Sequence, residues 1–127
     1  MLINLSNHPS ARWGTEQIEA ASSNYGDIVD LEFPDISPDY TYEQVYKLAQ
    51  DFLLQCEEIL PSPSGTDAVH LTGEIVFCAI LSRLLLQKGY AVVCSTTRRV
   101  VDVLDDGTIL RRFKFVAFRE YGKPMSI

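Results

Sequence analysis

The sequence predicts a compact, three-layer Rossmann-like α/β domain with four mostly parallel strands and a C-terminal β-hairpin. Strand-like and helix-like runs alternate three times, and this alternation places parallel strands in one sheet with helices on its faces. A fourth apolar run, residues 90–95, has the composition of an interior parallel strand. The 127 residues contain no repeat or low-complexity segment, which predicts a single domain over residues 1–127.

The first third of the chain predicts two strands around a short helix. Residues 1–6 and 27–33 are alternating apolar runs of strand length. Between them, residues 14–26 have helical composition, with Thr15 as a candidate N-cap and Gly26 as a candidate stop.

The middle of the chain predicts two longer helices. Residues 41–60 carry apolar side chains at three- and four-residue intervals, and Thr41 and Gln44 have the spacing of a capping box. A third strand is expected over residues 66–71, followed by a helix over residues 74–88. That helix is apolar around most of its circumference, so we expect it to be covered on more than one side, by the sheet or by a second subunit.

The end of the chain changes pattern. Residues 99–104 and 108–118 alternate like strands and flank the turn signal Asp106-Gly107. This arrangement predicts an antiparallel hairpin.

Composition narrows the range of partners. The net charge is −6, from 17 acidic and 11 basic residues, which argues against nonspecific binding of long nucleic acids but permits a small anion at a local site. The three cysteines are far apart in apolar runs and indicate buried thiols in a reducing, cytoplasmic setting. We expect no metal site, no cofactor, no signal peptide and no membrane span, because none of the corresponding motifs occurs.

Polar segments follow three of the predicted parallel strands, where ligands of open α/β sheets bind. They are "SNHPS", "TGE" and "STTRR". In "TGE", Gly73 would let a ligand approach the backbone, and Glu74 would accept from a ribose hydroxyl or a base amine. The alternative is that Thr72 or Gly73 caps the helix while Glu74 complements the helix dipole.

The sequence leaves more than one role possible for the arginines and for the histidine of these segments. Arg98 and Arg99 are adjacent, so on an extended segment they point to opposite sides, and one of them would face a phosphate. The alternative is a solvated pair at the start of the hairpin. His8, held extended by Pro9, is a phosphate donor, an acid or base, or a loop-packing residue. His70 lies inside a strand and is interpreted as structural.

Taken together, the segments "NLSNHPS", "GDIVDLEFP", "VHLTGE", "STTRRVV" and "FKFVAFREY" resemble the small stand-alone CRISPR-associated proteins of the CARF and ring-nuclease kind. The resemblance covers most of the chain. It implies a CARF-like homodimer in type III CRISPR antiviral defence, with a cyclic oligoadenylate across the two-fold axis. It also implies the residues of a nucleotide-binding pocket: Asn7, His8, Ser10, Thr72, Gly73, Glu74, Ser95, Thr96, Thr97 and Arg98, with Arg99 as the alternative to Arg98.

Three functions follow as hypotheses. The first is a ring nuclease, in which a ribose 2′-hydroxyl attacks the neighbouring phosphate without a metal, with His8 and Arg98 as catalytic residues. The second is a sponge or sensor that binds the messenger without cleaving it. The third is an unrelated Rossmann-like module for another small anion or a protein partner.

Overall fold

The structure is a computed structural model that describes residues 1–125. It has the alternating order of strands and helices that the sequence predicts, with a short 3₁₀ helix, η1, added after the first strand. The elements are β1 Leu2–Ser6, η1 Ser10–Arg12, α1 Thr15–Tyr25, β2 Ile28–Asp30, α2 Tyr42–Ile59, β3 Ala68–Thr72, α3 Ile75–Gln87, β4 Ala91–Val103 and β5 Ile109–Glu120.

The strands form one mixed sheet in the order β2-β1-β3-β4-β5. Neighbouring strands from β2 to β4 are parallel, and β5 runs antiparallel to β4. The chain passes from β1 to β2 on one side and then crosses to β3 on the other side of β1. The strand order therefore reverses at β1 and β3, and the predicted α/β class is confirmed with a topology consistent with a Rossmann-like fold.

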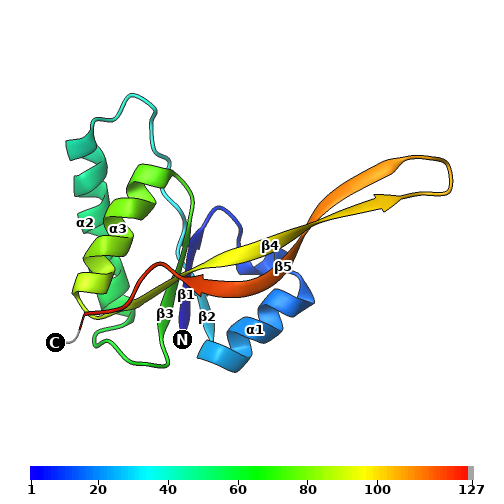
Figure 1. The fold of residues 1–127 in the computed structure, drawn as a ribbon. Helices are drawn as coiled ribbons and strands as arrows, with labels where there is room; N and C mark the ends of the chain where they lie inside the picture. Colours follow the sequence, from blue (N-terminus) through cyan, green and yellow to red (C-terminus); the bar gives the residue numbers. More distant parts are fainter. Residues whose placement is uncertain (126–127) are drawn as a thin grey trace.

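Helices cover both faces of this sheet (Figure 1). On one face, α2 and α3 enclose the larger core, which includes Ile3 and Leu71 of the strands and Phe77 and Leu81 of α3, all fully buried. On the other face, α1 packs over a smaller core. Alternate side chains of each strand serve the two cores, because successive residues point to opposite faces.

Local sequence signals predicted two of the helix ends correctly and one wrongly. The capping box before α2 is confirmed: the Gln44 amide donates to Thr41 Oγ1 at 3.3 Å, and the Thr41 amide donates to Gln44 Oε1 at 2.8 Å. Gly26 ends α1 with a φ of 86°, as predicted. The prediction of Thr15 as an N-cap is wrong, because the N-cap is Gly14 and no side chain caps this end.

The last two strands differ from the prediction in their extent. The expected strands 90–95 and 99–104 are one continuous strand, β4, which pairs with β5 from Val93 to Val103. Beyond the register shift between Thr96 and Thr97, the pair leaves the body of the domain as a two-stranded arm (Figure 1). The polar segment does not interrupt the strand because cross-strand hydrogen bonds, not burial, maintain it there.

The second strand is shorter than expected. Only Ile28–Asp30 pair with β1, whereas the prediction extended to residue 33. The remaining residues follow an irregular path that brings Phe33 against Phe77, with their ring centroids 5.2 Å apart. A strand ends where no partner continues its hydrogen bonds, and the alternation of side chains alone does not show this.

Helix α3 is covered on the sides that face the sheet and α2, as expected for an apolar helix. Its first turn remains open to solvent, with Ile75 80% exposed and Val76 44% exposed. Within residues 1–125, no helix combines the length and the apolar character that a membrane crossing requires.

Candidate functional site

The candidate site begins where the three central strands change from apolar to polar on the α1 face. Each strand first contributes one apolar residue to the smaller core: Leu2, Ala68 and Val93. Two residues further along each strand, the side chain on the same face is polar: Asn4, His70 and Ser95. The parallel register places Asn4 beside His70. Asn4, His70 and Ser95 therefore form a polar row across the sheet, near the carboxyl ends of its strands.

Hydrogen bonds join this row into a chain. Asn4 Oδ1 lies 2.9 Å from His70 Nδ1, and His70 Nε2 lies 2.7 Å from Ser95 Oγ. From α1, Gln17 Nε2 donates to the same Ser95 Oγ at 3.0 Å. These hydrogen bonds thus connect the buried amide of Asn4 to the Ser95 hydroxyl near the surface through the imidazole of His70.

The orientation of the Asn4 amide follows from its other contacts. Its Nδ2 donates to Asp30 Oδ1 at 2.8 Å and to the His8 carbonyl at 2.9 Å. Both partners only accept hydrogen bonds, so Nδ2 must face them and Oδ1 must face His70. Ser6 Oγ completes the arrangement by donating to Asn4 Oδ1 at 2.8 Å.

The imidazole of His70 is held neutral. Only 3% of the residue is exposed. Burial, with a smaller contribution from the charge of His8, lowers the pKa of His70 from 6.5 to about 4. The rings of Trp13 and Phe118 meet the imidazole in T-shaped contacts, at centroid distances of 5.2 and 5.6 Å. Near neutral pH, His70 therefore has one donor and one acceptor nitrogen.

Asp30 lies at the Asn4 end of this series of hydrogen bonds. Besides Asn4, it accepts from the backbone amide of Ser10 at 3.1 Å and from Ser10 Oγ at 2.8 Å. Partial burial alone would raise the pKa of Asp30, but the hydrogen bonds from Asn4 and Ser10 outweigh it and lower that pKa. This carboxylate holds the loop that carries His8 against the end of β1.

A cavity of about 700 Å³ opens over the Ser95 end of the chain. Aromatic, basic and hydroxyl-bearing side chains line it together, from the η1 loop, α1, β3, β4 and β5. The lining residues are His8, Arg12, Trp13, Gly14, Thr15, Glu16, Gln17, His70, Thr72, Ser95, Thr97, Arg112, Phe113, Lys114 and Phe115.

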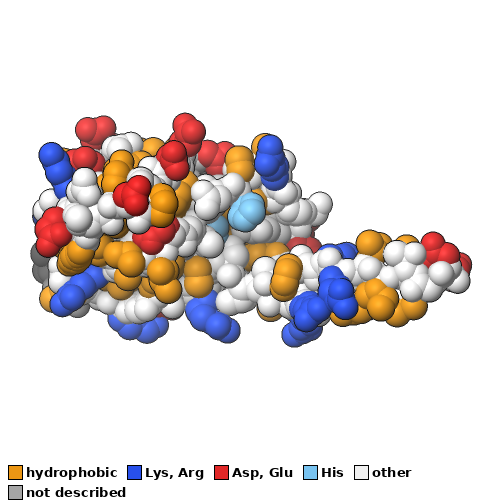
Figure 2. All heavy atoms as spheres, turned by 90° about the horizontal axis from the view of Figure 1, so that it is seen from above, with side chains coloured by type: hydrophobic (Ala, Val, Ile, Leu, Met, Phe, Trp, Pro, Cys, Tyr) orange, Lys and Arg blue, Asp and Glu red, His pale blue; other side chains and the backbone are white. Residues whose placement is uncertain are grey.

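The cavity lies where the arm leaves the body. In Figure 2, imidazole surface is visible near the root of the arm, and basic side chains gather along the adjoining part of the arm. The acidic side chains in this view lie mainly on the body and at the tip of the arm. A locally basic region therefore exists on a chain whose net charge is −6.

Four of the residues predicted for the site line this one cavity: His8, Thr72, Ser95 and Thr97. Asn7 lies instead at a second hollow of about 440 Å³, which Asp30 and Phe33 also line. Ser10 contributes through its two hydrogen bonds to Asp30 rather than through the cavity wall.

In the "TGE" turn, the Glu74 carboxylate and the space beside Gly73 are already taken by contacts within the protein. Glu74 is the N-cap of α3 and accepts from the backbone amides of Val76 and Phe77, both at 2.9 Å. The ring of Phe33 lies over Gly73, so that a Cβ added there would be 2.1 Å from Phe33 Cζ. These contacts favour the helix-start interpretation for Gly73 and Glu74, with Glu74 rather than Thr72 or Gly73 as the cap.

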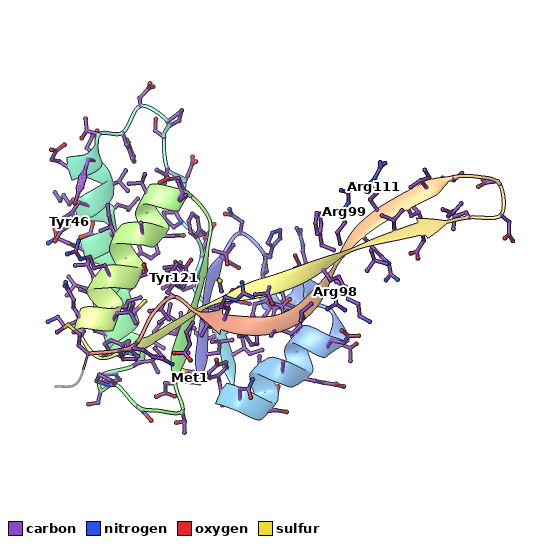
Figure 3. All side chains as sticks on the ribbon, in the orientation of Figure 1. Met1, Tyr46, Arg98, Arg99, Arg111 and Tyr121 are labelled. Carbon is purple, nitrogen blue, oxygen red and sulfur yellow. The ribbon has the colours of Figure 1, made fainter. Side chains whose placement is uncertain are left out.

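The remaining predicted residues lie at or beyond the root of the arm. Thr96 Oγ1 donates to the Ala117 carbonyl at 3.1 Å. Arg98 and Arg99 are exposed on β4 and are not among the residues that line the cavity. Figure 3 shows Arg99 and Arg111 on one side of the arm and Arg98 on the opposite side, as strand alternation predicts.

Several residues of the site were missed from the sequence: Asn4, Gln17, Asp30, Arg112 and Lys114. One signal was available, because Asn4 and His70 are polar residues inside otherwise apolar strands, and buried polar groups need specific partners. The basic residues of β5 gave no such signal, since alternation in a hairpin does not reveal which part of it meets the body.

The site contains no obvious group of metal ligands. Across the part of the chain that the structure describes, no three His, Cys, Asp or Glu side chains cluster as a metal ion would require. The chemistry available at the cavity is that of imidazole, hydroxyl, guanidinium, ammonium and aromatic groups, together with the carboxamide of Gln17 and the carboxylate of Glu16.

Comparison with known proteins gives a family but no activity. A family model described as "Uncharacterized protein MJ1673 family" matches residues 1–119. Neither a curated protein nor a solved structure matches the chain significantly.

Proposed function

Because the chain belongs to the uncharacterized protein MJ1673 family, whose description names no activity, we propose its function from the cavity: it binds a cyclic oligoadenylate and cleaves it without a metal. The observation that carries this proposal is the combination of aromatic and basic side chains in one cavity at the carboxyl edge of the sheet. The resemblance to stand-alone CARF and ring-nuclease proteins supplies the identity of the ligand.

Each component of the cavity suits one part of such a ligand. The rings of Trp13, Phe113 and Phe115 offer faces on which bases stack, worth about 1–3 kcal/mol for each base. Arg112 and Arg12 offer planar guanidinium groups that bind phosphate through two oxygens. A volume of about 700 Å³ is in the range of small-molecule sites rather than of extended nucleic-acid grooves.

The proposed reaction is attack of a ribose 2′-hydroxyl on the adjacent phosphate. The 2′-hydroxyl gives up its proton as the 2′-O–P bond forms, the 5′-oxygen leaves with the electrons of the broken P–O bond and takes up a proton, and the attacking ribose ends with a cyclic 2′,3′-phosphate. Such a step requires in-line positioning and cations near the phosphate. Arg112 and Lys114 line the cavity and take the phosphate role first assigned to Arg98 and Arg99. Both form exposed ion pairs, Arg112 Nε with Asp102 Oδ2 at 3.1 Å and Lys114 Nζ with Glu16 Oε1 at 3.3 Å, so a phosphate would compete with these carboxylates. His8 remains the candidate for proton transfer.

The proposal includes a homodimer. A cyclic ligand with an even number of identical units, such as cyclic tetra- or hexa-adenylate, matches a two-fold axis, so both copies would contact it through the same residues. The cavity has the arm as one wall, and the arm extends away from the body where a second copy would meet it (Figure 1).

The test is direct incubation of the full chain with labelled cyclic tri-, tetra- and hexa-adenylate in the presence of a metal chelator. We expect linear product from at least one ring. We expect Arg112→Gln to slow its formation about tenfold or more, the effect of losing one charge-assisted hydrogen bond to phosphate. Arg83→Gln is the matched control, because Arg83 is exposed on α3 and is not among the residues that line the cavity.

The outcomes separate the alternatives. Tight binding with intact ligand identifies a sponge or sensor instead of an enzyme. The absence of binding to all three rings rejects the proposal and leaves the third hypothesis, a module for another anion or for a protein.

A further inference from the structure

The hydrogen-bond donors and acceptors of the polar row determine which way the Ser95 hydroxyl donates. Asp30 and the His8 carbonyl fix the Asn4 amide, so Asn4 Oδ1 faces His70 Nδ1 at 2.9 Å. That nitrogen must then carry the proton of the neutral imidazole. His70 Nε2 is therefore an acceptor, and Ser95 Oγ, 2.7 Å away, must donate to it.

The hydroxyl of Ser95 is left with a defined capacity. A serine hydroxyl has one proton to donate and two lone pairs that accept. The proton is used by His70, and one lone pair accepts from Gln17 Nε2 at 3.0 Å. One lone pair remains without a partner among residues 1–125, on an oxygen whose residue lines the cavity. Ser95 therefore offers the cavity an acceptor and no donor.

Burial makes this assignment firm. Asn4 is 1% exposed and His70 is 3% exposed, so water cannot easily replace either partner. Moving the proton to Nε2 would leave an unprotonated Nδ1 facing the acceptor Asn4 Oδ1 in a buried position, and turning the ring over would place a carbon there instead of a nitrogen. An unsatisfied buried group of this kind costs about 1–3 kcal/mol.

We propose that Ser95 forms a subsite that accepts a hydrogen bond from a ribose 2′-hydroxyl of the bound nucleotide, with His70 and Asn4 as positioning residues that keep the serine in its accepting state. This inference rests on the proposed function and adds the feature by which the site would distinguish ribose from sugars that lack a 2′ donor. The same bond would orient the hydroxyl whose oxygen attacks the phosphate.

The experiment compares cyclic oligoadenylates with their 2′-fluoro analogues. Fluorine is close in size to a hydroxyl and keeps the ribose pucker, but it donates no hydrogen bond and cannot attack. Affinities for cyclic tri-, tetra- and hexa-adenylate and for each analogue are measured by rapid mixing, before turnover. The ratio of the two affinities is the readout, because the fraction of correctly folded protein cancels in it.

We expect the wild-type chain to favour the 2′-hydroxyl ligand about tenfold, the effect of one net hydrogen bond. Ser95→Ala should bring the ratio close to one, and Ser95→Thr should restore it by returning a hydroxyl. His70→Leu should also lower the ratio, because Ser95 would then be free to rotate and donate. Ser82→Ala is the matched control and should leave the ratio unchanged, since Ser82 Oγ donates to the Ala79 carbonyl at 3.0 Å and Ser82 is not among the residues that line the cavity.

Two results would overturn the inference, and they differ from each other. Binding with an unchanged ratio in Ser95→Ala removes the subsite and leaves the proposed function standing. Failure of the wild-type chain to bind any of the rings removes the proposed function and the subsite with it. Nitrogen NMR of His70 gives a check without ligand: a proton on Nε2 instead of Nδ1 near neutral pH contradicts the positioning role.

Discussion

At the scale of single residues, two positions restrict the side chains that they can accept, one through hydrogen bonds and one through packing. His70 is the clearest case, because it is a titratable group inside the sheet whose two ring nitrogens both have partners. Gly73 is a second case, because the ring of Phe33 occupies the place of a side chain. Neither position tolerates a change that its neighbours cannot accommodate.

The buried imidazole predicts that acid destabilises the fold. The pKa of His70 is lowered to about 4 in the folded chain, against 6.5 for an unperturbed histidine. Between these values the unfolded chain binds a proton that the folded chain does not, so the free energy of unfolding falls as the pH drops. The loss due to His70 should be on the order of 3 kcal/mol between pH 7 and pH 4.

Urea unfolding of the wild-type chain and of His70→Gln checks this prediction. The variant should lose most of the pH dependence down to about pH 4.5, the range above the usual titration of carboxylates such as Asp30. Leu54→Gln, at an exposed residue of α2 without a titratable group, should keep the wild-type slope. Equal slopes in the wild type and His70→Gln would contradict the assignment of a buried, neutral His70.

The packing at Gly73 predicts that a single methyl group destabilises the chain. In Gly73→Ala the new Cβ would lie 2.1 Å from Phe33 Cζ, so the ring must leave its contact with Phe77. We expect a loss of about 1–3 kcal/mol in thermal or urea unfolding. Gly65→Ala is the control, because nothing lies within 4 Å of its added Cβ. A Phe33→Leu background should recover part of the loss; full additivity of the two changes would argue against a clash.

At the scale of elements, helix ends differ in how strongly local sequence defines them. The start of α2 is held by reciprocal hydrogen bonds between Thr41 and Gln44. The start of α3 is held by the Glu74 carboxylate, which accepts from two backbone amides. The start of α1 has no side-chain cap and follows the η1 turn instead. The first two are encoded within four residues, and the third depends on the path of the preceding loop.

This difference predicts unequal effects of two similar substitutions. Thr41→Ala removes a capping-box hydroxyl and should lower the free energy of unfolding by about 1 kcal/mol. Thr15→Ala should change it little, because Thr15 is the first residue of α1 and its N-cap, Gly14, precedes it. Urea denaturation of both variants decides the matter. An equal loss in both would mean that Thr15 has a capping role that the structure does not contain.

At the scale of the whole molecule, the arm exposes several large apolar side chains to solvent in a single copy of the chain. On one of its faces, Val101, Val103, Ile109 and Phe113 are 52%, 71%, 51% and 74% exposed. An isolated two-stranded ribbon has little stability of its own in water. An arm of this length with exposed apolar side chains therefore favours a partner surface.

We expect the chain to be a homodimer in which this face of the arm contacts the second copy. Light scattering at micromolar concentration should give twice the monomer mass. The double change Val103→Thr and Ile109→Thr, at residues directly opposite each other, should shift the chain towards monomer. The control is Leu110→Thr, which is 49% exposed and pairs with Asp102 on the other face. A monomer in every sample would contradict the homodimer.

The amino-acid sequence alone determined the features that depend on neighbouring residues. The alternation of strands and helices, the capping box at Thr41 and the stop at Gly26 are each expressed within a few positions, so they were predicted correctly. The edge of the sheet that carries the cavity also followed, because parallel strands place their carboxyl ends together. His8, Thr72, Ser95 and Thr97 were predicted for this reason, and the structure places them at one cavity, while their functional roles stay a prediction.

Only the tertiary structure decided the features that depend on distant partners. Asn4 and His70 are 66 positions apart, and their hydrogen bond exists because β1 and β3 pair in one particular register. The place of Arg112 and Lys114 at the cavity wall depends on how far β5 runs along β4 before the arm leaves the body. The continuity of β4 through "STTRR" has the same origin. Pairing register and strand extent are set by hydrogen bonds between segments, which no local pattern contains.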